Sequence, residues 1–247
     1  MRKALILSCI LIIGYTSQAQ SITYGSTNTW FFLHNKLDLN EKWSLENELH
    51  ERLGAFLKDQ GQLLIRPFVN FSPTQGLVLS AGYTFIDSQP YEPYSSTVFA
   101  RENNIWEQVL LKQKIGKVDM SYRFRQEHRW VNRSEEVNGI RVDLGDQYLN
   151  RFRFRYTLKF PLKTFENSQQ IFVQAFDEIW MKQGTNLLPT DLNRNWLYLG
   201  LGYKVSKKLN FQVGYMHQYD KISSANFISS PIIQVSIFKG FSLLKEE

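Results

Sequence analysis

Polar and apolar side chains alternate with a period of two along most of this chain, most sharply between Val118 and Leu162. Successive side chains of a β-strand point to opposite faces, so the alternation predicts strands with one charged and one apolar face. The charged face of this stretch comprises Arg123, Arg125, Glu127, Arg129, Arg151, Arg153, Arg155 and Lys159. The opposite face comprises Tyr122, Phe124, Trp130, Phe152, Phe154, Tyr156, Leu158 and Phe160. Charges on one face and aromatic residues on the other are typical of a transmembrane β-barrel.

The same period predicts eleven strands, which are joined alternately by short turns and longer loops. They are expected at residues 28–39, 43–53, 62–72, 77–87, 101–112, 118–130, 147–162, 170–180, 196–205, 209–219 and 227–238. Bacterial single-chain barrels have even strand counts, so a twelfth strand is expected at Ser21 to Gly25, with ten strands as the alternative. The fold prediction is therefore an all-β, antiparallel up-and-down transmembrane β-barrel of about 12 strands.

Loop length predicts an orientation, because outer-membrane barrels keep short turns on the periplasmic side and long loops outside. The loops expected to be extracellular are 54–60, 88–100, 131–146, 181–193 and 221–226. Aromatic residues favour the headgroup level at both membrane interfaces, which gives an independent indication. The predicted aromatic girdle comprises Trp30, Trp43, Trp130, Trp180 and Trp196, of which only Trp43 falls at a periplasmic strand end.

The first nineteen residues have the features of a cleaved secretory signal peptide. Arg2 and Lys3 precede an apolar stretch from Ala4 to Tyr15, which is too short for a membrane-spanning helix, and Ser17-Gln18-Ala19 fits a cleavage site. Leu7-Ser8-Cys9 resembles a lipidation box, although the apolar run continues past it. We therefore expect a signal peptide at 1–19 and one outer-membrane β-barrel domain at 20–247.

Cleavage changes both the charge and the available chemistry. It removes two positive charges, so the formal net charge of +6 becomes +4, and it removes the single cysteine. The mature chain then has no internal disulfide and no thiolate metal site. Its basic residues lie on strand faces and form no basic cluster, so nucleic acid is not an expected partner.

The candidate site is the set of charges that faces the lumen. The predicted lumen charge network comprises Glu46, Glu48, Arg123, Arg125, Glu127, Arg129, Arg151, Arg153, Arg155 and Glu178. Further inward charges are Arg52, Arg66, Glu102 and Lys159. One interpretation is structural, with Arg and Glu of neighbouring strands paired across a narrow lumen. The other is an arginine ladder that guides small anionic solutes through a pore.

Enzymatic sites are weakly indicated. Of the histidines His34, His50, His128 and His217, only His128 beside Glu127 and His217 near Ser223 form arguable catalytic pairs. We therefore expect no catalytic residues, no metal site and no cofactor, with a lipid-modifying outer-membrane enzyme as the alternative. Gly200 and Gly202 lie within a strand with no following helix, so they are expected to make room for bulky neighbours inside the barrel.

Three segments resemble an outer-membrane family grouped as domain of unknown function 2490. They are Trp43 to Glu48, Tyr122 to Glu127, and Asn150 to Leu162, which ends in Phe-Pro-Leu. The resemblance implies an exported barrel without an assigned reaction. The sequence thus predicts a protein of the cell outer membrane, structural or forming a narrow pore. Its expected partners are outer-membrane lipid, lipopolysaccharide and the barrel assembly machinery, and a soluble β-sandwich is the alternative fold.

Overall fold

The structure is a computed structural model that describes residues 20–23, 27–90, 99–138, 140–167, 169–221, 223 and 226–244. The predicted signal peptide at 1–19 and the loop segment that contains Tyr91 and Tyr94 lie outside the described residues. Within the described part of the chain, no helix is long and apolar enough to cross a membrane.

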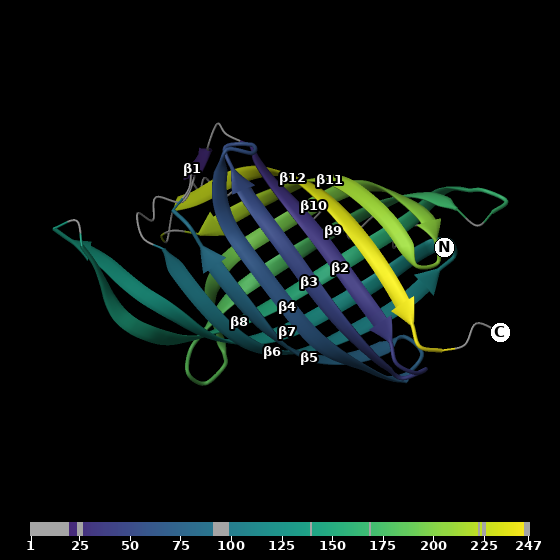
Figure 1. The fold of residues 1–247 in the computed structure, drawn as a ribbon, viewed down its shortest axis with the longest axis horizontal. Coiled ribbons are helices and arrows are strands. Elements are labelled where there is room, and N and C mark those ends of the chain that lie inside the picture. Colours follow the sequence, from purple (N-terminus) through teal and green to yellow (C-terminus); the bar gives the residue numbers. More distant parts are fainter. Residues whose placement is uncertain are drawn as a thin grey trace, which may run out of the picture.

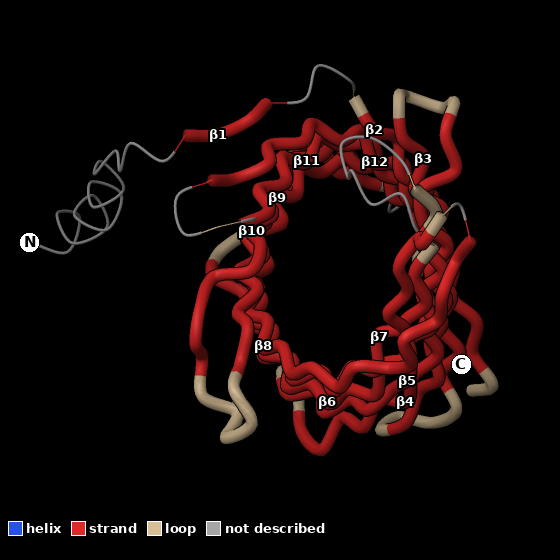
Figure 2. The backbone as a smooth tube through the Cα atoms, turned by 90° about the vertical axis from the view of Figure 1, so that its left-hand side faces the viewer, coloured by secondary structure: helices blue, strands red, loops and turns tan. Residues whose placement is uncertain are grey.

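Eleven strands, β2 to β12, form one sheet that closes into a barrel (Figures 1 and 2), and the short strand β1 is added at its seam. The strands are β1 (Gln20–Thr23), β2 (Asn28–Asp38), β3 (Trp43–Gly54), β4 (Asp59–Thr74), β5 (Leu77–Ser88), β6 (Ala100–Ile115), β7 (Val118–Val137), β8 (Ile140–Thr164), β9 (Gln170–Gln183), β10 (Pro189–Ser206), β11 (Leu209–Lys221) and β12 (Asn226–Ser242). All eleven strands that the alternation predicts are present. A single closed sheet also rules out the two packed sheets of a β-sandwich.

The closing pair distinguishes this barrel from the predicted one. Consecutive strands from β2 to β12 are antiparallel, but β12 pairs with β2 in parallel, from Ile232 opposite Asn28 to Ser242 opposite Asp38. An up-and-down sheet with an odd number of strands begins and ends in the same direction, so its closing pair has to be parallel. The expectation of twelve, or ten, wholly antiparallel strands is therefore wrong.

The predicted twelfth strand exists only as β1, and it does not run opposite to β2. It pairs in parallel with β12 from Gln20 opposite Asn226 to Thr23 opposite Ser229. Both β1 and β2 therefore lie along the same edge of β12, one after the other. A rule that counts strands of alternating direction cannot detect this arrangement.

The longest predicted loop, 131–146, is mostly strand. β7 continues to Val137 and β8 begins at Ile140, with a register shift at Arg133 and Ser134. This hairpin projects beyond the neighbouring strands at the long-loop end of the barrel (Figure 1). Polar residues such as Asn132 and Asp146 fit an exposed hairpin as well as a loop, so the loss of aromatic alternation here does not mark the end of a strand.

The outer face of the barrel is apolar all the way round. Each of the eleven strands contributes at least one exposed large apolar residue: Phe31, Leu45, Ile65, Leu79, Ile105, Phe124, Phe160, Ile179, Leu199, Val213 and Ile233. Aromatic pairs cross between β7 and β8 on this face, with ring centroids 5.1 Å apart for Phe124 and Phe154. The predicted apolar outer face is confirmed for these strands, and the inner face carries the charged residues together with a buried apolar cluster on β2 and β9 to β12.

The prediction for Gly200 and Gly202 is confirmed, and the last strand is longer than predicted. A Cβ atom on Gly202 would lie 2.1 Å from the Phe172 ring, and one on Gly200 would lie 2.2 Å from the Tyr198 hydroxyl, so these glycines do make room for inward rings. Phe238, at the end of the last predicted strand, faces the lumen, 5.4 Å from Phe32 between ring centroids. β12 continues to Ser242, and Phe241 is the exposed aromatic residue near its end.

Candidate functional site in the barrel lumen

The register of β7 and β8 places like charges opposite one another. Arg123 pairs with Arg155 and Arg125 pairs with Arg153 across the two strands. Directly opposed like charges destabilise a sheet, so these arginines need carboxylates from elsewhere. The next pair, Glu127 opposite Arg151, and the neighbouring strand β9 supply them.

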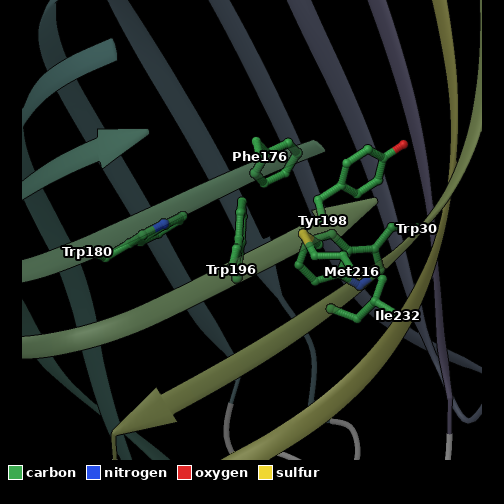
Figure 3. Close-up of a cluster of buried hydrophobic side chains, with 7 residues drawn as sticks. All are labelled: Trp30, Phe176, Trp180, Trp196, Tyr198, Met216 and Ile232. Atoms are coloured by element: carbon green, nitrogen blue, oxygen red, sulfur yellow. The ribbon is translucent and has the colours of Figure 1, made fainter. Parts of the chain in front are cut away.

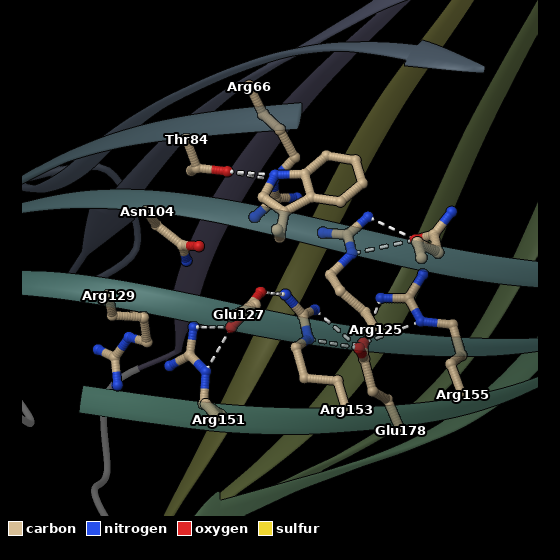
Figure 4. Close-up of polar contacts among 12 residues, drawn as sticks. Arg66, Thr84, Asn104, Arg125, Glu127, Arg129, Arg151, Arg153, Arg155 and Glu178 are labelled. Carbon is tan, nitrogen blue, oxygen red and sulfur yellow. Dashed lines mark hydrogen bonds and ion pairs between the residues drawn. The ribbon is translucent and has the colours of Figure 1, made fainter. Parts of the chain in front are cut away.

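Glu178 on β9 is the main counter-ion of the network (Figure 4). Its carboxylate accepts hydrogen bonds from Arg123 Nη2 at 2.5 Å, Arg153 Nε at 2.7 Å and Arg155 Nε at 2.9 Å. The side chain is fully buried, with 0% of its surface exposed. One carboxylate therefore neutralises part of the charge of three guanidinium groups.

Glu127 on β7 extends the network toward the long-loop end. It accepts hydrogen bonds from Arg151 Nε at 2.6 Å and from Arg153 Nη1 at 2.8 Å, and it is also fully buried. Arg153 thus bridges the two buried carboxylates (Figure 4). Charge-assisted bonds of this kind are stronger than neutral ones and fix side-chain geometry.

A second part of the network is built on β3 to β6. Arg66 Nη1 donates to Glu48 at 2.5 Å, and its Nε donates to Thr84 Oγ1 at 2.9 Å. Arg125 reaches no carboxylate within 4 Å among the described residues. Its Nε and Nη2 donate to Gln108 Oε1 at 3.0 and 2.8 Å, and its guanidinium lies 4.0 Å from the Trp106 ring centroid.

The two remaining predicted network members pair locally, nearer the ends of the barrel. Arg129 donates to Glu102 at 2.7 and 2.6 Å. Glu46 binds His34 Nε2 at 2.6 Å and Asn70 Nδ2 at 2.6 Å. All ten predicted network residues therefore face the lumen, but they do not form a continuous ladder. Six of them share the cluster around Glu127 and Glu178, and the other four, Glu46, Glu48, Arg125 and Arg129, each have separate partners.

Next to the ionic network, the lumen holds an apolar cluster built on β2 and β9 to β12 (Figure 3). The cluster comprises Trp30, Phe176, Trp180, Trp196, Tyr198, Met216 and Ile232. The aromatic-girdle prediction is therefore wrong for Trp30, Trp180 and Trp196, which are 2%, 3% and 5% exposed inside the barrel. Trp43 and Trp130 do lie on the outer face. The alternation itself placed Trp30 and Trp180 with the inward residues, and that signal outweighs their position at strand ends.

Cation–π contacts join the ionic network to the apolar cluster. The guanidinium carbon of Arg153 lies 3.6 Å from the Trp180 ring centroid, and that of Arg155 lies 4.0 Å from the Phe176 centroid. Arg52 lies 4.0 Å from the Trp30 ring in the same way. A small cavity of about 50 Å³ lies among Arg153, Phe176 and Trp196. The middle of the lumen is therefore filled by side chains.

A larger cavity, the vestibule, lies between this filled middle and the short-turn end. Its volume is about 350 Å³. Arg123, Arg125 and Arg155 line its inner part, and Lys36 and Lys112 line the part nearer the turns. A second hollow of about 630 Å³ at the rim shares Lys112 with it and adds Lys114 and Lys159.

The candidate catalytic histidines lie on the outer face of the barrel, on the opposite side of the strand from the network. His128 Nδ1 contacts the Tyr148 hydroxyl at 2.7 Å, and Glu127 points into the lumen, so that candidate pair is not formed. His217 Nε2 instead contacts Ser229 Oγ at 2.8 Å across the β11–β12 pair, and its Nδ1 contacts the Tyr215 hydroxyl at 2.7 Å. Ser223 is near His217 in the chain, but the register of β11 and β12 brings Ser229 to it instead.

Within the described residues, no group of three or more His, Cys, Asp or Glu side chains could hold a metal ion. The fold and the lumen define a class: a closed, meandering β-barrel with an apolar exterior and an interior filled by charged and aromatic side chains. The chain belongs to the family described as protein of unknown function (DUF2490), whose model matches residues 27–228. It is also similar to an uncharacterised protein of Methylorubrum extorquens, with 22% identity over 202 residues that cover 77% of this chain and 78% of that protein.

Proposed function

We propose that this chain is an outer-membrane β-barrel whose own side chains close its lumen, so that it serves as a structural barrel and not as an open pore. The observation that carries this proposal is the burial of the central lumen. A water-filled channel would leave lumen-facing side chains exposed, but Glu127 and Glu178 are 0% exposed and Arg153 is 2% exposed. Pairing satisfies these charges without solvent.

The apolar exterior supports the membrane part of the proposal. Soluble monomers rarely expose a large contiguous apolar surface, and here every strand of the barrel contributes to one. Closure also pairs β12 with β2, so the ring of β2 to β12 has no open strand edge. Lipid could not form hydrogen bonds with the backbone groups of such an edge. The predicted signal peptide at residues 1–19 agrees with export. Outer-membrane lipid, lipopolysaccharide and the barrel assembly machinery are the partners this proposal requires.

Planar-bilayer recording of the refolded mature chain tests the closed lumen. We expect a silent bilayer from protein that is folded, as shown by a heat-resistant band on a gel. Stable current steps would contradict the proposal. Anion selectivity in a salt gradient, lost when Arg123, Arg125, Arg153 and Arg155 are neutralised, would instead establish the narrow anion pore.

A second candidate function rests on the contact between His217 and Ser229. Acyl transfer needs a nucleophile, a base within hydrogen-bond reach and a group that orients the base, and Ser229, His217 and Tyr215 offer these three parts. In such a reaction, Ser229 Oγ would attack a lipid ester carbonyl while His217 takes its proton and returns it to the leaving alcohol. Water would then release the acyl group. Ser229 is only 3% exposed, so a lipid ester would have little access to its hydroxyl, and the structural function is favoured.

Release of fatty acid from a phospholipid in detergent tests this second function. If the barrel is a lipase, Ser229→Ala and His217→Ala should each lower the rate about 10²- to 10⁴-fold. Ser230→Ala is the matched control, because Ser230 is the next residue on the strand and faces the lumen. Absence of any release by the unsubstituted protein would exclude the function.

A further inference from the structure

The vestibule holds more positive than negative charge. Five cationic side chains line it, Lys36, Lys112, Arg123, Arg125 and Arg155, against the two carboxylates Glu46 and Glu48. Both carboxylates are already engaged, Glu46 by His34 and Asn70 and Glu48 by Arg66. The excess of two positive charges remains when the ion-pair partners outside the cavity wall are added. These are Glu178, which binds Arg123 and Arg155, Asp38, which lies 2.8 Å from Lys36, and Arg66, which binds Glu48.

Two buried guanidinium N–H groups lie behind the inner end of the vestibule without an acceptor in the described part of the chain. Among the described residues, neither Arg125 Nη1 nor Arg123 Nε has a hydrogen-bond acceptor. Arg125 is 1% exposed and meets only the neutral Gln108 side chain and the Trp106 ring. Burying a guanidinium without a counter-ion is costly, and an anion that entered the cavity would lower that cost.

We propose that the vestibule binds a small organic or inorganic anion with a carboxylate or phosphate group. Arginine presents its N–H donors in a planar fork that fits both groups. Arg123 and Arg155, whose side chains are 13% and 22% exposed, would contact the anion, and the buried charge of Arg125 would attract it from behind them. A volume of about 350 Å³ suits a small metabolite, since ligand pockets begin at roughly 300 Å³. The remaining walls combine hydroxyls, such as Ser121 and Thr157, with the apolar side chains of Val78 and Leu110. A short carbon skeleton would contact these walls.

The rim at the short-turn end of the barrel carries positive charges that would attract anions toward the vestibule. Lys112, Lys114 and Lys159 line the adjoining hollow, whose one acidic residue, Asp119, lies 3.6 Å from Lys114. Lys112 is exposed and has no carboxylate within 4 Å among the described residues. Charged walls of one sign concentrate oppositely charged solutes. Anions would therefore enter from the short-turn end and stop at the filled middle of the barrel.

Calorimetric titration of the refolded protein in a zwitterionic detergent tests the site, with inorganic phosphate and succinate as probes and neutral succinamide as the blank. We expect saturable binding of at least one anion and none of succinamide. The tighter of the two anions identifies which group the arginines prefer. Arg125→Gln should weaken binding about tenfold, and Lys112→Gln about threefold, because each removes a cation from the cavity wall.

Arg133→Gln is the matched control, since it removes the same charge from an exposed position in the β7–β8 hairpin and should leave binding unchanged. If Arg125→Gln fails to fold, Lys112→Gln still tests the site, because Lys112 is exposed and lies outside the buried network. No saturable heat with either anion, or an equal loss in Arg133→Gln, would overturn the proposal. The two proposals are tested separately. Absence of anion binding in the titration would not contradict the closed lumen, and current steps in a bilayer would not contradict the anion site.

Discussion

Glu178→Gln is expected to destabilise the barrel by about 3–5 kcal/mol, the usual cost of removing one partner from a buried charge cluster. Glutamine preserves the size of the side chain but removes the negative charge that Arg123, Arg153 and Arg155 share. Its amide group would also turn a donor toward at least one guanidinium. The free energy of unfolding in urea, measured on the refolded protein in detergent, reports the loss.

Asp119→Asn is the control for this experiment. It neutralises a carboxylate in an exposed ion pair, in which the Lys114 and Asp119 side chains are 66% and 55% exposed. Exposed pairs contribute about 0–1 kcal/mol, so this variant should unfold close to the unsubstituted protein. Equal losses for the two variants would mean that the buried network does not stabilise the barrel more than a surface pair does.

Trp196→Ala is expected to lower the free energy of unfolding by about 3–5 kcal/mol, because it removes a buried indole from a packed cluster. The ring lies 4.5 Å from Trp180 and 5.4 Å from Trp30 between centroids, and its Nε1 donates to Gln218 Oε1 at 2.6 Å. Because this ring fills part of the lumen, the variant should also give intermittent current steps in a bilayer. Urea unfolding and single-channel recording on one preparation measure both effects.

Trp43→Ala is the matched substitution on the outer face. Trp43 is 43% exposed and pairs with Phe71 at 4.7 Å between ring centroids, so its loss should cost about 1 kcal/mol and produce no current. If Trp43→Ala were as destabilising as Trp196→Ala, the lumenal cluster would not be the packed core of this protein.

Alternation alone was enough to locate all eleven barrel strands and the inward face of each charged segment. It succeeded because strand geometry forces neighbouring side chains to opposite sides, whatever the rest of the fold does. It failed where the outcome depends on contacts far apart in the sequence. The parallel β12–β2 seam is such a case, because nothing in either strand reveals the direction of its partner.

The partners within the site show the same limit. Sequence reasoning found Glu127, Arg153 and Glu178, but the pairing of Arg125 with Gln108 depends on the register of β6 and β7. Trp30, Trp180 and Trp196 lie at strand ends, as girdle residues do, but the period of two puts Trp180 on the same face as Glu178, and the structure buries all three rings in the lumen. For this chain, the face of a residue was a better guide than its position along the strand.

The seam has a consequence for biogenesis. Its two strands lie near opposite ends of the chain, so the ring cannot close until the segment Asn226–Ser242 has been synthesised and delivered. Until then β2 and β11 would each present a row of unpaired backbone groups, which are templates for pairing with other chains. A protein truncated before β12 would therefore be an open sheet with two unpaired edges, and β12 is the strand that removes both of them.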